Sequence, residues 1–153
     1  MIETKLDTTF VGLKVINAWP MTYGKYLRYM TMSNEMNINH ESLSGYLVEY
    51  EGEEGGDGNH PNHKGYVSWS PEEPFDKSYY NVNTGMPFEA ALLLLKRGKT
   101  ITRKGWQDSY IDVLGLANSG KAIEKVNLVN CKANIWTPTF EDLLADDWVV
   151  GPA

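Results

Sequence analysis

The sequence predicts an α+β protein of two small modules, with an antiparallel sheet and one main helix in the C-terminal domain. Two observations predict this fold. Short runs of β-branched and aromatic residues alternate with turn residues along the whole chain, and a single strongly amphipathic helical stretch stands in its second half. We expect a small α+β N-terminal module, of unassigned role, over residues 10–80 and a second domain over residues 84–153, joined by the polar segment Asn81–Gly85.

The patterns of the N-terminal module predict a strand, a short helix, a hairpin and a second helix. A Gly-rich acidic loop separates the two hairpin strands. Ser70, Pro71 and Glu73 have the spacing of a capping box at the start of the second helix, which we expect to pack on the hairpin. The expected elements are Phe10–Ala18, ended by Trp19-Pro20, a helix capped by Thr22, the strands Gly45–Tyr50 and Tyr66–Trp69, and a helix through Phe75 and Tyr79.

The main helix begins at Pro87 and ends before Gly98, which suits a left-handed residue after a helix. Apolar side chains recur along it at helical spacing. Leu93 and Leu94 widen the apolar stripe, which suggests that a second subunit covers another face of the helix. The stripe consists of Phe88, Ala91, Leu92 and Leu95.

Five strands and one helical turn are expected after this helix. Thr137-Pro138-Thr139 opens the turn, whose apolar side chains Phe140, Leu143 and Leu144 are expected to face inward. The strands are Thr100–Arg103, Tyr110–Leu116, Glu124–Asn130, Lys132–Trp136 and Trp148–Val150, with turns at Asn118–Gly120 and Asn130–Lys132.

The charge distribution limits the class of partner. Residues 1–83 carry twelve acidic residues against six Lys and Arg, whereas residues 84–153 carry eight of each. This acidic balance disfavours polynucleotides and membrane surfaces, but a local group of cations is suited to one small anionic ligand. Those cations are Lys96, Arg97, Lys99, Arg103 and Lys104. Cys131 is the only cysteine and no apolar run is long enough to span a membrane, so we expect a cytosolic protein.

Candidate metal sites in the N-terminal module are weak. His60 and His63, with Asp57 nearby, contain ligand types that suit zinc, but the Gly-rich setting favours a solvated surface loop. The acidic run from Glu51 to Asp57 lacks the ordered spacing of a calcium loop. We therefore predict no metal and no cofactor.

The sequence contains no persuasive catalytic set. Nucleophile-elbow, zinc-protease, Walker and dinucleotide motifs are absent. Asp142, Asp146 and Asp147 have the chemistry of an acid or base, but Asp142 also has the spacing of a capping-box partner for Thr139. We predict a protein that is not an enzyme.

Two short segments have the chemistry of a nucleotide site. In the first, Arg103 and Lys104 precede Trp106, and in the second, Trp136 precedes Thr137 and Thr139. An exposed indole stacks on a base, a guanidinium forks onto a phosphate, and hydroxyls donate to anionic oxygens. Tryptophans that simply belong to the core remain the alternative.

These segments resemble the Thoeris anti-defence 2 family of small phage domains. The resemblance covers about residues 86–151 and consists of separated motifs in the family's order. Pro87 departs from the usual Asn, residues 108–134 lack close similarity, and residues 1–83 resemble a phage module without a known function. The matching motifs are Phe88-Glu89-Ala90, Leu95-Lys96-Arg97-Gly98-Lys99, Arg103-Lys104-Gly105-Trp106, Trp136-Thr137 and Asp142-Leu143-Leu144-Ala145-Asp146-Asp147-Trp148.

The resemblance implies a sponge that binds a cyclic nucleotide or an ADP-ribose-derived immune signal, such as glycocyclic ADP-ribose, without cleaving it. It also implies a homo-oligomer, dimer or tetramer, that acts in the host cytoplasm. Carried onto this sequence, the expected ligand-binding residues are Phe88, Arg103, Lys104, Trp106, Trp136, Thr137, Thr139 and Asp142. The alternative is a phage accessory or virion-associated module whose acidic N-terminal half contacts a host protein.

Overall fold

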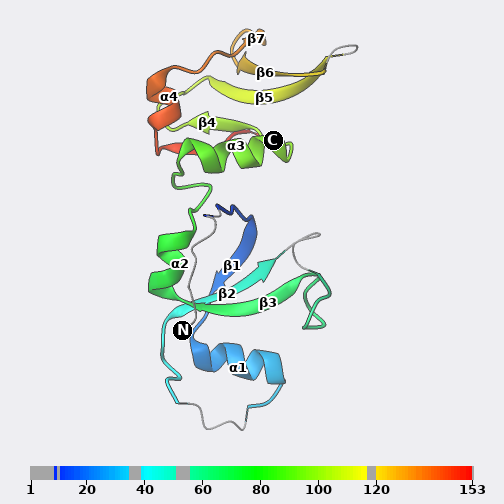
Figure 1. The fold of residues 1–153 in the computed structure, drawn as a ribbon, viewed down its shortest axis with the longest axis vertical. Coiled ribbons are helices and arrows are strands. Elements are labelled where there is room, and N and C mark those ends of the chain that lie inside the picture. Colours follow the sequence, from blue (N-terminus) through cyan, green and yellow to red (C-terminus); the bar gives the residue numbers. More distant parts are fainter. Residues whose placement is uncertain (1–8, 10, 35–38, 51–55, 117–119, 153) are drawn as a thin grey trace, which may run out of the picture. The chain divides into compact units, whose positions relative to one another are not determined.

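The computed structural model describes residues 9, 11–34, 39–50, 56–116 and 120–152. The chain forms two compact units, Met1–Tyr79 and Tyr80–Ala153. Each unit contains one antiparallel sheet and short helices (Figure 1), which confirms the predicted α+β class. Within the described ranges, no helix is long and apolar enough to cross a membrane.

The N-terminal unit has a three-stranded sheet with one helix on each face. Phe75 of the second helix stacks on Tyr46 with ring centroids 4.1 Å apart, as the sequence predicted. On the opposite face, Trp69 contacts Tyr23 of the first helix and its indole donates to the Met21 carbonyl oxygen over 2.8 Å. The elements are β1 (Ile16–Pro20), α1 (Tyr23–Thr31), β2 (Gly45–Tyr50), β3 (Tyr66–Pro71) and α2 (Glu72–Ser78), with the strand order β1-β2-β3.

Two predictions for this unit are wrong. Phe10 lies outside the described residues, and residues 11–15 are not in a strand. The strand runs from Ile16 through Pro20, which an edge strand tolerates. The capping box is not formed: Ser70 extends β3, and Pro71 is the residue that caps α2, without a side-chain hydrogen bond. Ser70 pairs with Tyr46 in the sheet and therefore does not cap α2.

The expected solvated loop around His60 and His63 is instead packed. His60 is 5% exposed and stacks on Tyr29, with ring centroids 4.2 Å apart. His63 donates through Nδ1 to the Glu49 carboxylate over 2.9 Å, and its Nε2 is 2.8 Å from the Tyr29 hydroxyl. The hydrogen bond from His63 lowers the pKa of Glu49 although burial opposes the shift.

The sequence pattern did not predict this packing, because a Glu is ordinarily a surface residue. Glu49 is buried, and a buried carboxylate requires hydrogen-bond donors. Among the residues that the structure describes, no group of three or more His, Cys, Asp or Glu is placed to hold a metal ion. Glu51, Glu53 and Glu54, from the acidic run that lacks the spacing of a calcium loop, lie outside the described residues.

The C-terminal unit is a five-stranded antiparallel sheet with one main helix (Figure 1). Its outer turn at Asn118–Gly120 lies mostly outside the described residues. The elements are α3 (Phe88–Lys96), β4 (Ile101–Arg103), β5 (Ser109–Leu116), β6 (Gly120–Asn127), β7 (Ala133–Ile135), α4 (Phe140–Leu144) and β8 (Trp148–Val150), with the strand order β7-β6-β5-β4-β8.

The core of this unit lies between α3 and the sheet face formed by β5, β4 and β8. Ile101 pairs with Ile111, and Trp148 pairs with Arg103, so all of these side chains share a face. The helix contacts β8, β4 and β5, the three strands at the end of the sheet farthest from β7. Leu94 is only 7% exposed and belongs to this core, so it does not form part of a surface left for a second subunit.

The prediction that α4 buries its apolar side chains is wrong. Phe140 and Leu144 are 86% and 85% exposed, and Leu143 is 40% exposed. The buried residue of this short helix is Asp142, and the indole Nε1 of Trp148 donates to its carbonyl oxygen over 2.9 Å. A helix as short as α4 has one position per turn that faces the rest of the unit, and in α4 the polar residue Asp142 occupies this position.

The helix α3 ends as its sequence predicts. Gly98 has a φ of +81°, its N–H donates to the Leu95 carbonyl oxygen, and the Lys99 N–H donates to that of Leu94. This is the hydrogen-bond pattern of a Schellman motif, which requires a left-handed residue.

We expect Gly98→Ala to reduce the free energy of unfolding of the C-terminal unit by about 1 kcal/mol, because a Cβ disfavours the left-handed region. A Cβ at Gly98 meets nothing within 4 Å, so the backbone conformation alone sets this cost. Gly105→Ala is the matched control, since that site is equally open and has no positive φ. Hydrogen exchange of the core amides measures both; equal stability of the two variants would contradict the expectation.

Candidate functional site

Four aromatic side chains gather at one end of the α3 core. Trp148 is fully buried at their centre. Its ring centroid is 5.5 Å from that of Phe88, 5.4 Å from that of Trp106 and 5.9 Å from that of Trp136. The two outer tryptophans are half-buried, so each retains surface for a ligand or a neighbouring side chain.

Arg103 joins three elements beneath these rings. From β4, its Nε donates to Asp147 over 2.6 Å and its Nη1 donates to Asp142 over 3.2 Å. Its side chain is 15% exposed, and the guanidinium lies 5.9 Å from the Trp148 ring centroid. The hydrogen bond to Asp147 raises the pKa of Arg103, against the effect of burial. The guanidinium is therefore engaged by two carboxylates of its own unit.

Asp142 is held equally firmly. Its Oδ2 accepts from the Thr139 N–H over 3.0 Å, while the Thr139 hydroxyl accepts from the Asp142 N–H over 3.1 Å. This is a complete capping box, the role that the sequence favoured for Asp142. Burial would raise the pKa of Asp142, but the hydrogen bonds from Thr139 and Arg103 together hold it below the usual value.

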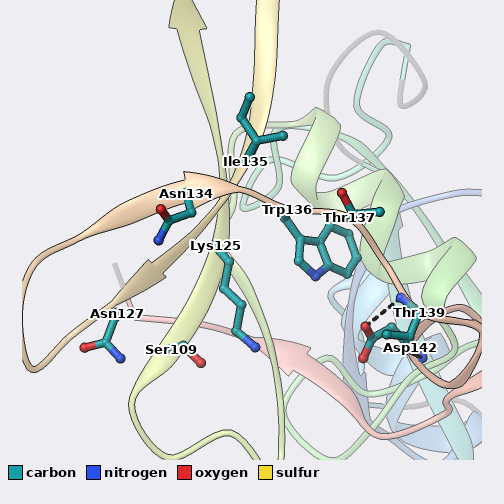
Figure 2. A pocket seen from close by; sticks show the side chains of 9 residues that line it. All are labelled: Ser109, Lys125, Asn127, Asn134, Ile135, Trp136, Thr137, Thr139 and Asp142. Carbon is teal, nitrogen blue, oxygen red and sulfur yellow. Dashed lines mark hydrogen bonds between the residues drawn. The ribbon is translucent and has the colours of Figure 1, made fainter.

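A cleft of about 570 Å³ opens beside the aromatic cluster. Its floor is the part of the α3-facing sheet surface that lies beyond the helix, because Lys125 pairs with the core residue Ile111 and so shares its face. Figure 2 shows Trp136 and Thr137 at one side of this floor and Thr139 with Asp142 beside them. The lining residues are Ser109, Lys125, Asn127, Asn134, Ile135, Trp136, Thr137, Thr139 and Asp142.

The polar floor follows from strand register. Asn127 pairs with Ser109 of β5, and Lys125 pairs with Asn134 of β7. Lys125 and Asn127 are two residues apart, so all four side chains point to one face. Ile135, next along β7, points away from the other labelled side chains (Figure 2).

Lys125 has an unusual position. Its Nζ lies 3.4 Å from the centroid of the Trp106 ring. The ammonium therefore covers one face of that ring, and the Trp148 ring meets Trp106 edge-on. Trp106 supports a cation of the cleft, whereas Trp136 itself forms part of the lining.

The structure brings half of the expected ligand-binding residues to the cleft, namely Trp136, Thr137, Thr139 and Asp142. The other four do not line the cleft. Phe88 packs on Trp136, and Arg103 donates a hydrogen bond to Asp142. The Trp106 ring lies under the ammonium of Lys125, and the exposed Lys104 donates through its N–H to the Asp147 carbonyl oxygen.

Five further residues line the cleft that the sequence motifs did not indicate, namely Ser109, Lys125, Asn127, Asn134 and Ile135. The alternation of Lys125 and Asn127 within a strand was the available signal. Without the pairing register, that signal does not show which face the two residues occupy.

The chemistry of the cleft is that of recognition. It combines an indole, one ammonium, amides and hydroxyls, the groups that contact a planar base, a phosphate and a ribose. The carboxylate that lines it, Asp142, has both oxygens occupied by Arg103 and Thr139. Fold and site together define a small α+β domain with a cleft lined by polar and aromatic side chains.

Comparison with protein families agrees with this description. Residues 86–151 match the model of the Thoeris anti-defense 2-like domain (Tad2-like), and the search of curated proteins found no match. The match lies within the C-terminal unit and is consistent with the family that the motifs had indicated. This match supports a general anti-defense role against the Thoeris system, exerted inside the host cell.

The lowered pKa of Asp142 gives the unit a predictable acid sensitivity. A carboxyl whose folded pKa lies below its unfolded value, about 3.9, stabilises the fold above that pH and ceases to do so as the pH falls through the folded pKa. We expect Asp142→Asn to be less stable than wild type at neutral pH, and this difference to shrink as the pH falls below about 4, the usual pKa of the unfolded carboxyl.

Urea unfolding of the C-terminal unit across this pH range measures the effect. Asp146→Asn is the control, because Asp146 is exposed and neighbours the same helix. A difference between wild type and Asp142→Asn that stays constant with pH would refute the assignment.

Proposed function

We propose that the C-terminal unit binds and sequesters a cyclic nucleotide or an ADP-ribose-derived immune signal without cleaving it, in the host cytoplasm. The observation that carries this proposal is the cleft beside Trp136, which joins an indole wall to a floor of amide, hydroxyl and ammonium groups. It lies within the residues that match the anti-defense family.

The base of the ligand packs on Trp136 in this proposal. That indole is fixed from behind by Phe88 and Trp148, at centroid distances of 5.9 Å each, so it is positioned before the ligand arrives. A fixed aromatic surface loses little conformational freedom on binding, which favours affinity. The Thr137 and Thr139 side chains are exposed at the same rim and are placed to contact ribose hydroxyls.

Sequestration rather than hydrolysis fits the state of Asp142. A general base needs an oxygen within reach of the attacking water. Both Asp142 oxygens already accept hydrogen bonds, and the pKa of this carboxyl is lowered, which makes it a weaker base. This state of Asp142 supports a site that holds its ligand intact.

Isothermal titration calorimetry with cyclic di-GMP, cyclic GMP-AMP, ADP-ribose and glycocyclic ADP-ribose tests this function. We expect binding of at least one of them, and recovery of that ligand unchanged after heat denaturation. Trp136→Leu should weaken binding about 5- to 150-fold, the range for loss of one stacked base.

Phe140→Leu is the control for the loss of a ring, because Phe140 is 86% exposed nearby and does not line the cleft. Absence of binding by the whole panel would overturn the proposal, and so would recovery of a cleaved ligand.

We also propose that the C-terminal unit self-associates through the sheet face opposite α3. Register places Tyr110, Leu114, Val126 and Ile135 on that face, and no described helix of the unit packs there. Leu114 is 41% exposed and Ile135 is 77% exposed. The face is mixed, since Asp112 and Glu124 pair across the same two strands between these apolar side chains. Exposed apolar side chains on an uncovered sheet face nevertheless favour a contact between subunits.

The double variant Leu114→Glu, Ile135→Glu should lower the oligomeric state of the full chain in sedimentation-velocity measurements, because charges would be buried at the contact. Leu144→Glu, on α4, is the matched control and should not change the sedimentation coefficient, although Leu144 is 85% exposed. Dissociation by Leu144→Glu alone would place the contact on α4 instead, and a monomeric wild type would refute self-association.

A further inference from the structure

We propose that Lys125 is the phosphate-binding cation of the cleft, and that Trp106 serves as the platform that holds its ammonium rather than as a surface for a base. This assignment rests on the proposed nucleotide-binding function and specifies which groups of the site meet the ligand's charge. It departs from the motif-based expectation, in which Arg103 meets the phosphate and Trp106 the base.

Arg103 is not available for this role. Its Nε and Nη1 are committed to Asp147 and Asp142 at 2.6 Å and 3.2 Å. A phosphate at this guanidinium would have to compete with two carboxylates that already neutralise it, in a setting where repulsion between like charges is strong. Of the described residues that line the cleft, Lys125 alone carries a positive charge.

Lys125 is free of such competition. Its cross-strand partners, Ile111 and Asn134, are uncharged. No carboxylate among the described residues forms an ion pair with its ammonium. The charge of Lys125 is therefore available to an anion that enters the cleft.

The Trp106 ring positions this charge without consuming its hydrogen bonds. The ammonium lies 3.4 Å from the ring centroid, within the range of a strong cation–π contact. An aromatic face attracts a cation but accepts none of its N–H donors in the way a carboxylate does. The ammonium is thus held at the floor with donors left for phosphate oxygens.

The same contact keeps a base off this side of Trp106. A stacked base lies about 3.5 Å from a ring, the distance at which carbon atoms make optimal contact. That position is taken by the Lys125 Nζ. The base and the phosphate are therefore assigned to different walls, with the base on Trp136 and the phosphate over Lys125.

The single ammonium also limits the ligand. Lys125 is one cation, and the one carboxylate of the described lining, Asp142, is already paired with Arg103, so the lining offers a single uncompensated positive charge. Such a site favours a ligand that presents one phosphodiester or pyrophosphate group over a linear nucleoside triphosphate, whose additional charges would remain uncompensated.

Calorimetry with the nucleotide that binds most tightly among cyclic di-GMP, cyclic GMP-AMP, ADP-ribose and glycocyclic ADP-ribose tests this assignment. Lys125→Gln should weaken binding about 10- to 150-fold, the range for loss of a hydrogen bond to a charged group. Lys125→Arg should remain within a few-fold of wild type. Lys121→Gln is the matched control, because it removes the same charge from an exposed position of the same strand, outside the cleft.

A second measurement follows the indole N–H signal of Trp106 in wild-type protein by nitrogen-15 NMR, with inorganic pyrophosphate and with the nucleotide as probes. We expect both probes to shift this signal, because the ammonium above the ring moves onto the anion. The signal should not respond in Lys125→Gln and should respond in Lys121→Gln. The wild-type measurement uses no variant, so a variant that fails to fold does not affect it.

The outcomes separate the two proposals. Nucleotide binding that Lys125→Gln leaves within about twofold, or binding without a Trp106 shift, overturns the role of Lys125 and leaves the proposed function standing. A pyrophosphate response that requires Lys125, without binding of any nucleotide, supports the phosphate site and overturns the proposed function. No response to either probe overturns both.

Discussion

The guanidinium of Arg103 is the constraint on which the C-terminal unit depends. From β4, which lies next to the edge strand β8, it reaches Asp142 in α4 and Asp147 just before β8, while lying against the Trp148 ring. One planar fork thereby joins β4 to two carboxylates that lie 39 and 44 residues further along the chain, a task that a point-like ammonium performs poorly. The capping box of α4, the position of Trp148 and the wall of the cleft all follow from this arrangement.

Local signals in the sequence were sufficient for most elements. Alternation defined β2 and its antiparallel partner β3, and helical spacing with Gly98 defined α3 and its end. The Thr139–Asp142 capping box was also readable, because both partners lie within one turn. Each of these features depends on neighbours a few residues away, which is where propensity and spacing carry information.

Features set by tertiary contacts were not readable. The burial of His60 and His63 depends on Glu49 and Tyr29, which are distant in sequence. Phe140 and Leu144 are typical core residue types, but they are exposed because Asp142 occupies the buried position of α4. For the candidate site, the motifs gave the aromatic wall, whereas the floor required the β5–β6–β7 register, since a shift of one residue would turn Lys125 to the opposite face.

The cleft has two sources within the chain. Its supporting frame, from Arg103 to Trp106 and from Trp136 to Trp148, comes from the motifs that resemble the family, whereas the four polar groups of its floor, Ser109, Lys125, Asn127 and Asn134, come from the intervening strands. Those strand positions project from a hydrogen-bonded ladder whose backbone pairing does not depend on their side chains. Under the proposed function, exchange of floor residues would change which signal the cleft binds, while the scaffold that keeps the domain folded stays the same.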